Sequence, residues 1–252
     1  MLEVSGLSKK FDRNKEQRYA VQDVSLTIAD NEIFALVGES GSGKSTLAEM
    51  IVGLQRPSAG RIYWQGQRIE RKPDYWQQVQ MIFQNPDRSL NPYWKVRDLI
   101  AEPLILQRVP REDAYHRVAR LLEQVSLPRE LGLRSTSECS GGQKQRVAIA
   151  RALALPPQLL IADEMTSALD PLTEREMLRL LLELKREHRL SLLYITHRLE
   201  TIDGFADRLA VMKDGRIVET GSCADILNAP QALYTKRLLD ACDYSAEPGV
   251  MK

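Results

Sequence analysis

Runs of apolar residues predict the strands of this chain. Alternation in LEVSGL and AVQDVSLTI predicts strands over residues 2–7 and 20–28, with the polar segment 12–18 as a loop between them. A further strand is predicted over 33–37, and largely apolar segments, which are typical of strands buried on both faces, occupy 158–164 and 190–197. Two further segments predict hairpins, 60–69 with its turn at Gly66 and 207–221 with its turn at Asp214-Gly215.

Apolar spacings of three and four residues predict the helices, which are 44–54, 96–106, 111–125 and 172–188. Strands that alternate with helices predict an α/β fold with a mostly parallel sheet, preceded by an N-terminal antiparallel β subdomain. We expect one domain over 1–252, built on an α/β core of 1–88 and 138–225. An α-helical subdomain over 89–137 interrupts this core, and C-terminal helices over 226–252 follow it.

Net charge, cysteine spacing and the lack of long apolar runs disfavour several classes of protein. A formal charge of +1 disfavours non-specific binding to nucleic acid. Cys139, Cys223 and Cys242 are too far apart in sequence for a metal-binding pair, so we expect reduced thiols. The N-terminus lacks the apolar core of a signal peptide and no apolar run is long enough to cross a bilayer, so we expect any membrane part to belong to another chain.

GESGSGKST matches the phosphate-binding pattern G-x-x-x-x-G-K-[ST] between a predicted strand and a predicted helix. Glycines allow backbone amides to face a polyphosphate, Lys44 adds a positive charge, and the Ser45 hydroxyl suits Mg²⁺. The alternative, a glycine-rich turn that binds nothing, does not explain the full pattern. The residues assigned to nucleotide binding here are Gly38, Glu39, Ser40, Gly41, Ser42, Gly43, Lys44, Ser45 and Thr46.

Acidic residues close the predicted strand 158–164. Asp163 is placed to hold Mg²⁺, and alternation along a strand predicts that Glu164 points elsewhere, toward a water that attacks the γ-phosphate. The alternative is a helix cap, a role for which Asp170 before Pro171 is better placed. His197 ends a strand and could contact a γ-phosphate, whereas His116 and His188 are expected to be solvated on helix faces.

A second glycine-rich segment, CSGGQ, opens the helical stretch after residue 140 and predicts another anion site. With the P-loop, CSGGQ, LLIADE, SALD and THR in this order, the chain resembles the ATP-binding-cassette ATPases over nearly its whole length. The resemblance implies ATP and Mg²⁺ as cofactors and a head-to-tail pair of ATPase domains. Each SGGQ segment, here Ser140, Gly141, Gly142 and Gln143, would then contact the nucleotide held by the partner.

The resemblance also implies roles for single residues. Phe11 matches the aromatic that stacks on adenine, with Tyr19 as a weaker rival, and Gln84 matches a glutamine that senses Mg²⁺. Ser45, Gln84 and Asp163 would bind the metal, and the loop from Ser167 to Asp170 would cross the dimer interface. Glu164 would be the general base and His197 would contact the γ-phosphate.

Departures from the family pattern are Ala162, Met165, Cys139 and Arg198, none of which removes a reacting group. FQNPDRSLNP and NAPQALYTKRLL resemble importers of oligopeptides, dipeptides and nickel, and the short C-terminus resembles subunits for nickel or metal-chelate uptake. The expected partners are a second ATPase subunit, two membrane permease subunits and an extracytoplasmic solute-binding protein. We expect the second ATPase subunit to be a different chain, with another copy of this chain as the alternative. The expected location is the cytoplasmic face of the inner membrane.

Other classes of protein fit less well. A cassette ATPase of DNA repair would carry a long coiled coil between the two glycine-rich motifs, and one of translation would usually carry two cassettes. A P-loop kinase or GTPase fits less well because the base-specifying motif N-K-x-D is missing. The segment NKEQ at Asn14 lies in the wrong place and ends in the wrong residue. A non-hydrolysing scaffold is disfavoured because Glu164 and His197 are both present.

Overall fold

A computed structural model describes residues 1–13, 16–69 and 73–241 of the chain. These residues belong to two compact units. The first unit comprises residues 1–76 and 191–252, and the second unit comprises residues 77–190. Asn14, Cys242 and the end of the predicted C-terminal helices lie outside the described residues.

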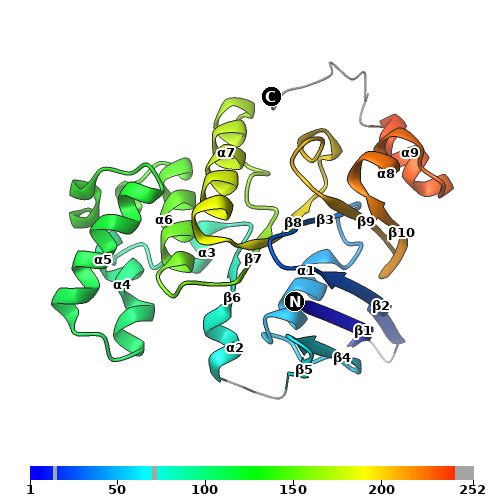
Figure 1. The fold of residues 1–252 in the computed structure, drawn as a ribbon, viewed down its shortest axis with the longest axis horizontal. Helices are drawn as coiled ribbons and strands as arrows, with labels where there is room; N and C mark the ends of the chain where they lie inside the picture. The colour runs from blue at the N-terminus through cyan, green and yellow to red at the C-terminus, as the bar shows by residue number, and fades with distance from the viewer. Residues whose placement is uncertain (14–15, 70–72, 242–252) are drawn as a thin grey trace. The chain divides into compact units, whose positions relative to one another are not determined.

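An antiparallel sheet in the order β2-β1-β4-β5 occupies the first unit (Figure 1). Its strands are β1 (Leu2–Arg13), β2 (Glu16–Ile28), β4 (Ala59–Trp64) and β5 (Gln67–Arg68). The loop expected over 12–18 is wrong for most of its length, because Asp12 pairs with Gln17 and Arg13 with Glu16. Backbone hydrogen bonds of a two-stranded ribbon do not require apolar side chains, so polarity alone misplaced the strand ends.

Parallel strands form the other sheet segment of the first unit. β3 (Ile33–Val37) lies between β8 (Ser191–Thr196) and β9 (Arg208–Lys213) and is parallel to both. Every residue of β3 is buried, as its continuous apolar run predicts. β10 (Arg216–Ser222) completes the predicted hairpin with β9. Val37 pairs with Thr196, so the segments that follow β3 and β8 leave the sheet at the same edge.

Short helices accompany these strands. They are α1 (Lys44–Ile51), the 3₁₀ turn η3 (Leu199–Thr201), α8 (Cys223–Asn228) and α9 (Leu233–Ala241). α2 (Pro73–Gln78) leads from the first unit into the second. Within the first unit the Tyr75 hydroxyl donates to the Ile51 carbonyl at 2.6 Å, which ties α2 to the end of α1.

The second unit pairs two parallel strands, β6 (Val79–Ile82) and β7 (Leu159–Asp163), with a group of helices (Figure 1). The helices are α3 (Pro86–Ser89), α4 (Val96–Leu106), α5 (Arg111–Gln124), η1 (Arg129–Leu133), η2 (Thr136–Glu138), α6 (Gly141–Leu153) and α7 (Pro171–His188). α4, α5 and α6 pack on one another, and Arg151 of α6 forms a 2.6 Å ion pair with Glu102 of α4.

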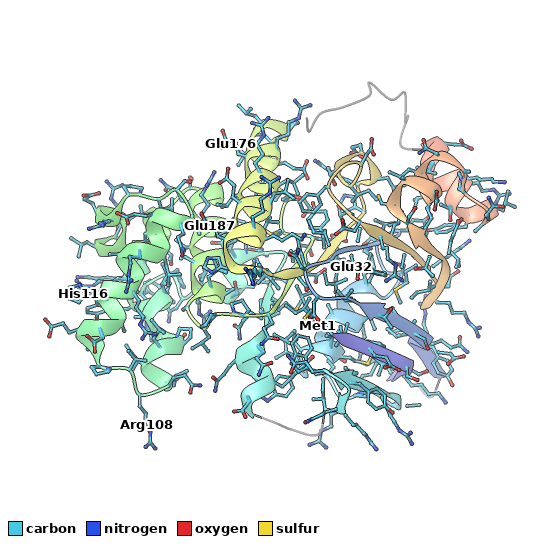
Figure 2. All side chains as sticks on the ribbon, in the orientation of Figure 1. Met1, Glu32, Arg108, His116, Glu176 and Glu187 are labelled. Atoms are coloured by element: carbon cyan, nitrogen blue, oxygen red, sulfur yellow. The ribbon has the colours of Figure 1, made fainter. Side chains whose placement is uncertain are left out.

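Two histidines that sequence placed on helix faces differ in their surroundings. His116 is exposed on α5, where Figure 2 labels it, as predicted. The expectation for His188 is wrong, because its ring is half-buried and its Nε2 is buried without a hydrogen-bond partner. The chain reverses at Arg189, with φ of 53°, and the Leu190 amide donates to the Lys185 carbonyl.

The cysteines within the described residues, Cys139 and Cys223, are buried and unpaired, in agreement with the expected reduced thiols. Over the same residues no helix combines the length and the apolar character that crossing a membrane requires.

Shortening one buried side chain of β3 tests the assignment of the core. Leu36 is fully buried, so we expect Leu36→Ala to lower the free energy of unfolding by about 2–5 kcal/mol through lost packing and a residual cavity. Leu54 is 62% exposed, and Leu54→Ala should change that free energy by no more than about 0.5 kcal/mol. Urea unfolding followed by circular dichroism compares the two, and equal losses would contradict the burial of β3.

Candidate active site

The loop between β3 and α1 surrounds a buried lysine. Lys44 is 3% exposed, and its Nζ donates to the carbonyl oxygens of Gly38 at 2.8 Å and Glu39 at 2.9 Å. A buried ammonium group requires acceptors because desolvation of a charge is costly. The loop backbone provides them, so the charge is held at the start of α1. The predicted strand–loop–helix context of the motif is confirmed.

Two glycines of this loop are required by close backbone contacts. A Cβ at Gly38 would lie 2.1 Å from the Met212 carbonyl oxygen, and one at Gly43, with φ of 106°, would lie 2.2 Å from that of Ala20. α1 begins after Gly43 without a side-chain cap, and the buried Ser42 Oγ has no hydrogen-bond partner. Uncapped amides, an orphaned hydroxyl and a lysine together suit a bound polyphosphate.

His197 and the aromatic candidates also belong to the first unit. His197 is exposed directly after β8, at the sheet edge where the loop after β3 also begins. Phe11 pairs with Arg18 and Lys10 pairs with Tyr19, which places Phe11 and Tyr19 on opposite faces of the β1–β2 ribbon. Only one of the two rings can therefore stack on a given ligand. Phe11 is 43% exposed, with the Lys9 Nζ 5.2 Å from its ring centre.

In the second unit, Gln84 and Glu164 meet. Ile82 of β6 pairs with Ala162 of β7, so the segments after both strands leave the same edge. The Gln84 Nε2 donates to the Glu164 Oε2 at 2.9 Å. The nearby Asp163 is the last residue of β7 and is 5% exposed. This edge therefore presents one buried carboxylate and one carboxylate oriented by an amide.

The prediction that strand alternation separates the directions of Asp163 and Glu164 is wrong. β7 ends at Asp163, and Glu164 has φ of 44°, in the left-handed region. Strand alternation therefore does not apply to Glu164. A turn after the strand sets its direction instead, and such sparsely populated backbone conformations are concentrated at functional sites.

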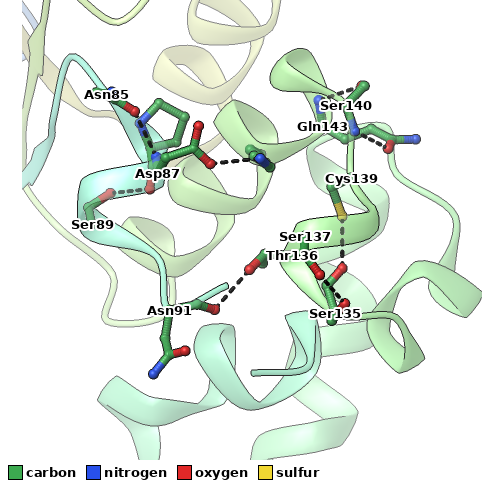
Figure 3. Close-up of polar contacts among 12 residues, drawn as sticks. Asn85, Asp87, Ser89, Asn91, Ser135, Thr136, Ser137, Cys139, Ser140 and Gln143 are labelled. Atoms are coloured by element: carbon green, nitrogen blue, oxygen red, sulfur yellow. Dashed lines mark hydrogen bonds and ion pairs between the residues drawn. The ribbon is translucent and has the colours of Figure 1, made fainter. Parts of the chain in front are cut away.

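The SGGQ segment forms the start of α6 (Figure 3). Ser140 is the N-cap: its Oγ accepts from the Gln143 amide at 3.3 Å, and the Gln143 Oε1 accepts from the Ser140 amide at 3.0 Å. These two bonds form a reciprocal capping box. A Cβ placed on the next residue, Gly141, would meet no atom within 4 Å. Cys139 is buried, and burial raises the pKa of its thiol, so it acts here as a small apolar residue.

Polar contacts tie the segment after Gln84 to the region around the SGGQ helix (Figure 3). The Asp87 amide donates to the Asn85 Oδ1 at 2.9 Å. The Asp87 carboxylate forms a 2.7 Å ion pair with Lys144 of α6. The Thr136 Oγ1 donates to the Asn91 carbonyl at 2.8 Å. A displacement of the segment after Gln84 would therefore be transmitted to α6.

The SGGQ segment and Asp170 line the same hollow, of about 620 Å³, in the second unit. Asp170 caps α7 by accepting from the Leu172 and Thr173 amides, each at 3.1 Å, so its predicted cap role is confirmed. Sequence analysis missed Arg146, which also lines this hollow. Its signal is a spacing of three residues from Gln143 along one helix, which places both on the same face.

The departures from the family pattern are accommodated locally. Ala162 is fully buried in β7, and Met165 is 2% exposed, so its thioether side chain packs in the interior. The Arg198 amide donates to the Thr196 Oγ1 at 3.0 Å, which closes the turn after β8.

The motifs define a P-loop ATPase, and comparison with known proteins gives its family. A sequence profile described as "ABC transporter" matches residues 21–167. The oligopeptide transport ATP-binding protein OppF of Lactococcus lactis is 40% identical over 92% of this chain and 74% of that protein. The chain belongs to the ABC transporter family and is one of its ATP-hydrolysing ATPases.

Other similar proteins agree on family and fold. The glutathione import ATP-binding protein GsiA of Pectobacterium atrosepticum is 41% identical over 96% of this chain and 41% of that protein. Among solved structures, cbiO1 of Clostridium perfringens, part of the ABC transporter complex cbiONQ, has 28% identity and a TM-score of 0.80, covering 90% of each chain. The ATP-binding cassette MJ0796, solved as a dimer bound to ADP and phosphate, has 29% identity and a TM-score of 0.80, covering 88% of this chain and 99% of that one. The predicted fold class is confirmed.

The Asp170 cap predicts a pH-dependent stability. Hydrogen bonds from the Thr173 hydroxyl and from the Thr173 and Leu172 amides lower the pKa of Asp170 below its ordinary value of 3.8. Its stabilising effect is thus complete above that value and is lost as the pH falls through the lowered pKa. We expect Asp170→Ala to lower Tm at pH 7, with the difference from the parent shrinking below about pH 4.

Asp240→Ala, at an exposed position on α9, is the control for loss of one acidic side chain. Thermal unfolding across pH measures both variants. A deficit in Tm for Asp170→Ala that stays constant through acid pH would show that the carboxylate is not the cap.

Proposed function

We propose that this ATPase drives import of peptide-type cargo through separate membrane subunits, as one member of a head-to-tail pair of ATPase domains. Its relatives OppF and GsiA are an oligopeptide transporter ATPase and a glutathione import ATPase, and a similar protein of Cupriavidus necator, MetN, is a methionine import ATPase. Their cargoes are all amino acids or peptides. Nickel and metal chelates remain the alternative cargo class.

Binding of the ATP polyphosphate is assigned to the loop from Gly38 to Thr46. The buried Lys44 ammonium and the uncapped amides at the start of α1 support this role, because both attract negative charge. Phe11 is proposed to stack on the adenine, and its partial exposure leaves a ring face available. ADP would keep most of these contacts but would lose those to the γ-phosphate.

Mg²⁺ is proposed to be held by Ser45, Gln84 and Asp163, whose hydroxyl, amide and carboxylate oxygens are the hard donors that this ion prefers. Among the described residues no cluster of three or more His, Cys, Asp or Glu is suited to hold a metal. When bound, Mg²⁺ neutralises charge on the phosphates.

Glu164 is proposed as the general base that accepts a proton from the attacking water, with His197 as the contact to the γ-phosphate. The 2.9 Å hydrogen bond from Gln84 supports this role because it orients the Glu164 carboxylate. Because Gln84 is also proposed to bind Mg²⁺, metal binding would change how the base is held.

One observation carries the proposed pairing of ATPase domains. Ser140, Gly141, Gly142 and Gln143 line a hollow of the second unit together with Asp170 and Arg146. Helix N-terminal amides and a serine hydroxyl bind an anion well. A γ-phosphate held by the P-loop of a partner chain is the ligand that this arrangement suits, so ATP would join the two domains.

Docking to the membrane subunits is assigned to a second hollow, of about 540 Å³, beside α4. Tyr93 and Leu106, both among its lining residues, are 89% and 76% exposed. Exposed large apolar side chains around a concavity mark surfaces that bind other proteins. A short amphipathic helix of a permease subunit is the occupant that we propose.

The remaining partners follow from the importer assignment. They are a second ATPase subunit, two permease subunits and an extracytoplasmic solute-binding protein, with this chain at the cytoplasmic face of the membrane. A role in DNA repair or translation is the alternative. The similarity to import ATPases over more than nine-tenths of the chain favours transport.

Two substitutions separate nucleotide binding from hydrolysis. Lys44→Ala removes the buried charge and should weaken ATP binding by at least about 10-fold, whereas Glu164→Gln should bind ATP as the parent does. Glu164→Gln should lower kcat by at least about 100-fold and accumulate an ATP-bound dimer. Nucleotide titration, phosphate release and size-exclusion chromatography with light scattering provide the three readouts.

Lys236→Ala on α9 and Glu187→Gln on α7, which change exposed side chains of the same types, are the matched controls. Hydrolysis by Glu164→Gln at the parental rate would remove Glu164 from the role of base. Unchanged ATP affinity in Lys44→Ala would overturn the phosphate site.

A further inference from the structure

We propose that Thr166 and Glu174 are positioning residues that hold Glu164 in the orientation needed to activate water. The proposal rests on the role of Glu164 as general base given above. Neither Thr166 nor Glu174 belongs to the motifs assigned from sequence. Both act through the backbone of the turn that carries Glu164.

A buried hydrogen bond links this turn to helix α7. The Thr166 Oγ1 donates to the Glu174 Oε1 at 2.7 Å, and the two residues are 2% and 4% exposed. The bond joins the segment after β7 to the first turn of α7, within the second unit. Water cannot replace a bond at this depth, so its geometry is retained in the folded chain.

The placement of Glu174 makes a buried carboxylate tolerable. Glu174 lies near the N-terminus of α7, whose dipole favours negative charge, and the Thr166 hydroxyl satisfies one of its oxygens. An apolar residue would avoid the cost of burying a charge at this position. We therefore infer that Glu174 is present as the hydrogen-bond acceptor that fixes Thr166, a role that an apolar side chain cannot fill.

Fixing Thr166 restrains Glu164 through the backbone. The Ser167 amide donates to the Glu164 carbonyl at 3.2 Å, and the Leu169 amide donates to the Thr166 carbonyl at 3.0 Å. Glu164 adopts a φ of 44°, which a glutamate rarely adopts unless its surroundings impose it. Because Thr166 is anchored two residues later, the turn cannot relax without breaking a buried bond.

The side chain of Glu164 is restrained separately. The Gln84 Nε2 donates to one of its carboxylate oxygens at 2.9 Å, and the backbone of the turn sets the direction from which the side chain starts. Gln84 thus fixes one end of this residue, and the bond between Thr166 and Glu174 fixes the other. Small displacements of a reacting group cost large factors in rate, so loss of the buried bond should lower kcat.

Steady-state and single-turnover ATP hydrolysis by the purified chain test this role. Thr166→Val removes the hydroxyl and keeps the side-chain shape, and we expect about a 10-fold lower kcat with the Kd for ATP unchanged within about 2-fold. Thr166→Ser restores the donor and should recover most of the lost rate. Tyr75→Phe removes another buried hydroxyl bond, in the first unit, and controls for lost stability.

A double-mutant cycle decides whether Thr166 acts through Glu164. With Glu164→Gln already present, Thr166→Val should change the residual rate by less than about 2-fold, because the base that it positions is gone. An equal loss of rate in both backgrounds, or parental kcat in folded Thr166→Val, would overturn the positioning role. If Thr166→Val does not fold, Thr166→Val/Glu174→Leu removes both halves of the bond and allows the same comparison.

The failure of this proposal is distinguishable from that of the proposed function. A large loss in Glu164→Gln together with parental kcat in Thr166→Val overturns only the positioning role. Parental kcat in Glu164→Gln overturns the assignment of the base and the positioning role with it.

Discussion

The buried ammonium of Lys44 is the constraint on which the nucleotide-binding loop depends. A positive charge with 3% exposure must be surrounded by acceptors, and the carbonyls of Gly38 and Glu39 provide them only if the loop curls back over the lysine. That curl brings the backbone at Gly38 and Gly43 against neighbouring carbonyl groups, where a Cβ does not fit. The need for glycine at these two positions is therefore part of the same close packing that holds the charge in place.

The second unit meets a different requirement, the exact placement of carboxylates and amides at the ends of two parallel strands. Gln84 and Glu164 follow β6 and β7 and bond to one another, while Asp170 caps α7 and shares a hollow with the SGGQ segment. Each group is held by a short local contact. The ion pair between Asp87 and Lys144 adds a link by which a movement after Gln84 would reach α6.

Most of the fold could be predicted from the sequence because its strands and helices have strong periodicity. The five buried residues of β3 and the repeating apolar face of α7 are examples. Residues 12–13 and 16–18 were misassigned because a ribbon held by backbone bonds can consist of polar residues. His188 was misassigned because its Nε2 is buried by tertiary packing, which the periodicity of a helix does not encode.

The candidate site was predicted as far as its motifs extend. Fixed spacing identifies the loop from Gly38 to Thr46, but it gives neither the left-handed backbone of Glu164 nor the bond between Thr166 and Glu174. The partners in that bond are separated by eight positions and meet only because a turn and a helix pack together. Such contacts arise from tertiary structure, so sequence patterns alone leave them out.

The function proposed for this ATPase is to drive the import of peptide-type cargo through separate membrane subunits. The most direct measurement is recovery of the tagged chain from detergent-solubilised membranes of its own host, with mass spectrometry of the proteins that accompany it. The account predicts two polytopic membrane subunits together with a second ABC ATPase chain or additional copies of this one. Recovery of ribosomal or DNA-repair proteins in place of membrane subunits would leave the ATPase chemistry intact and contradict the transport function.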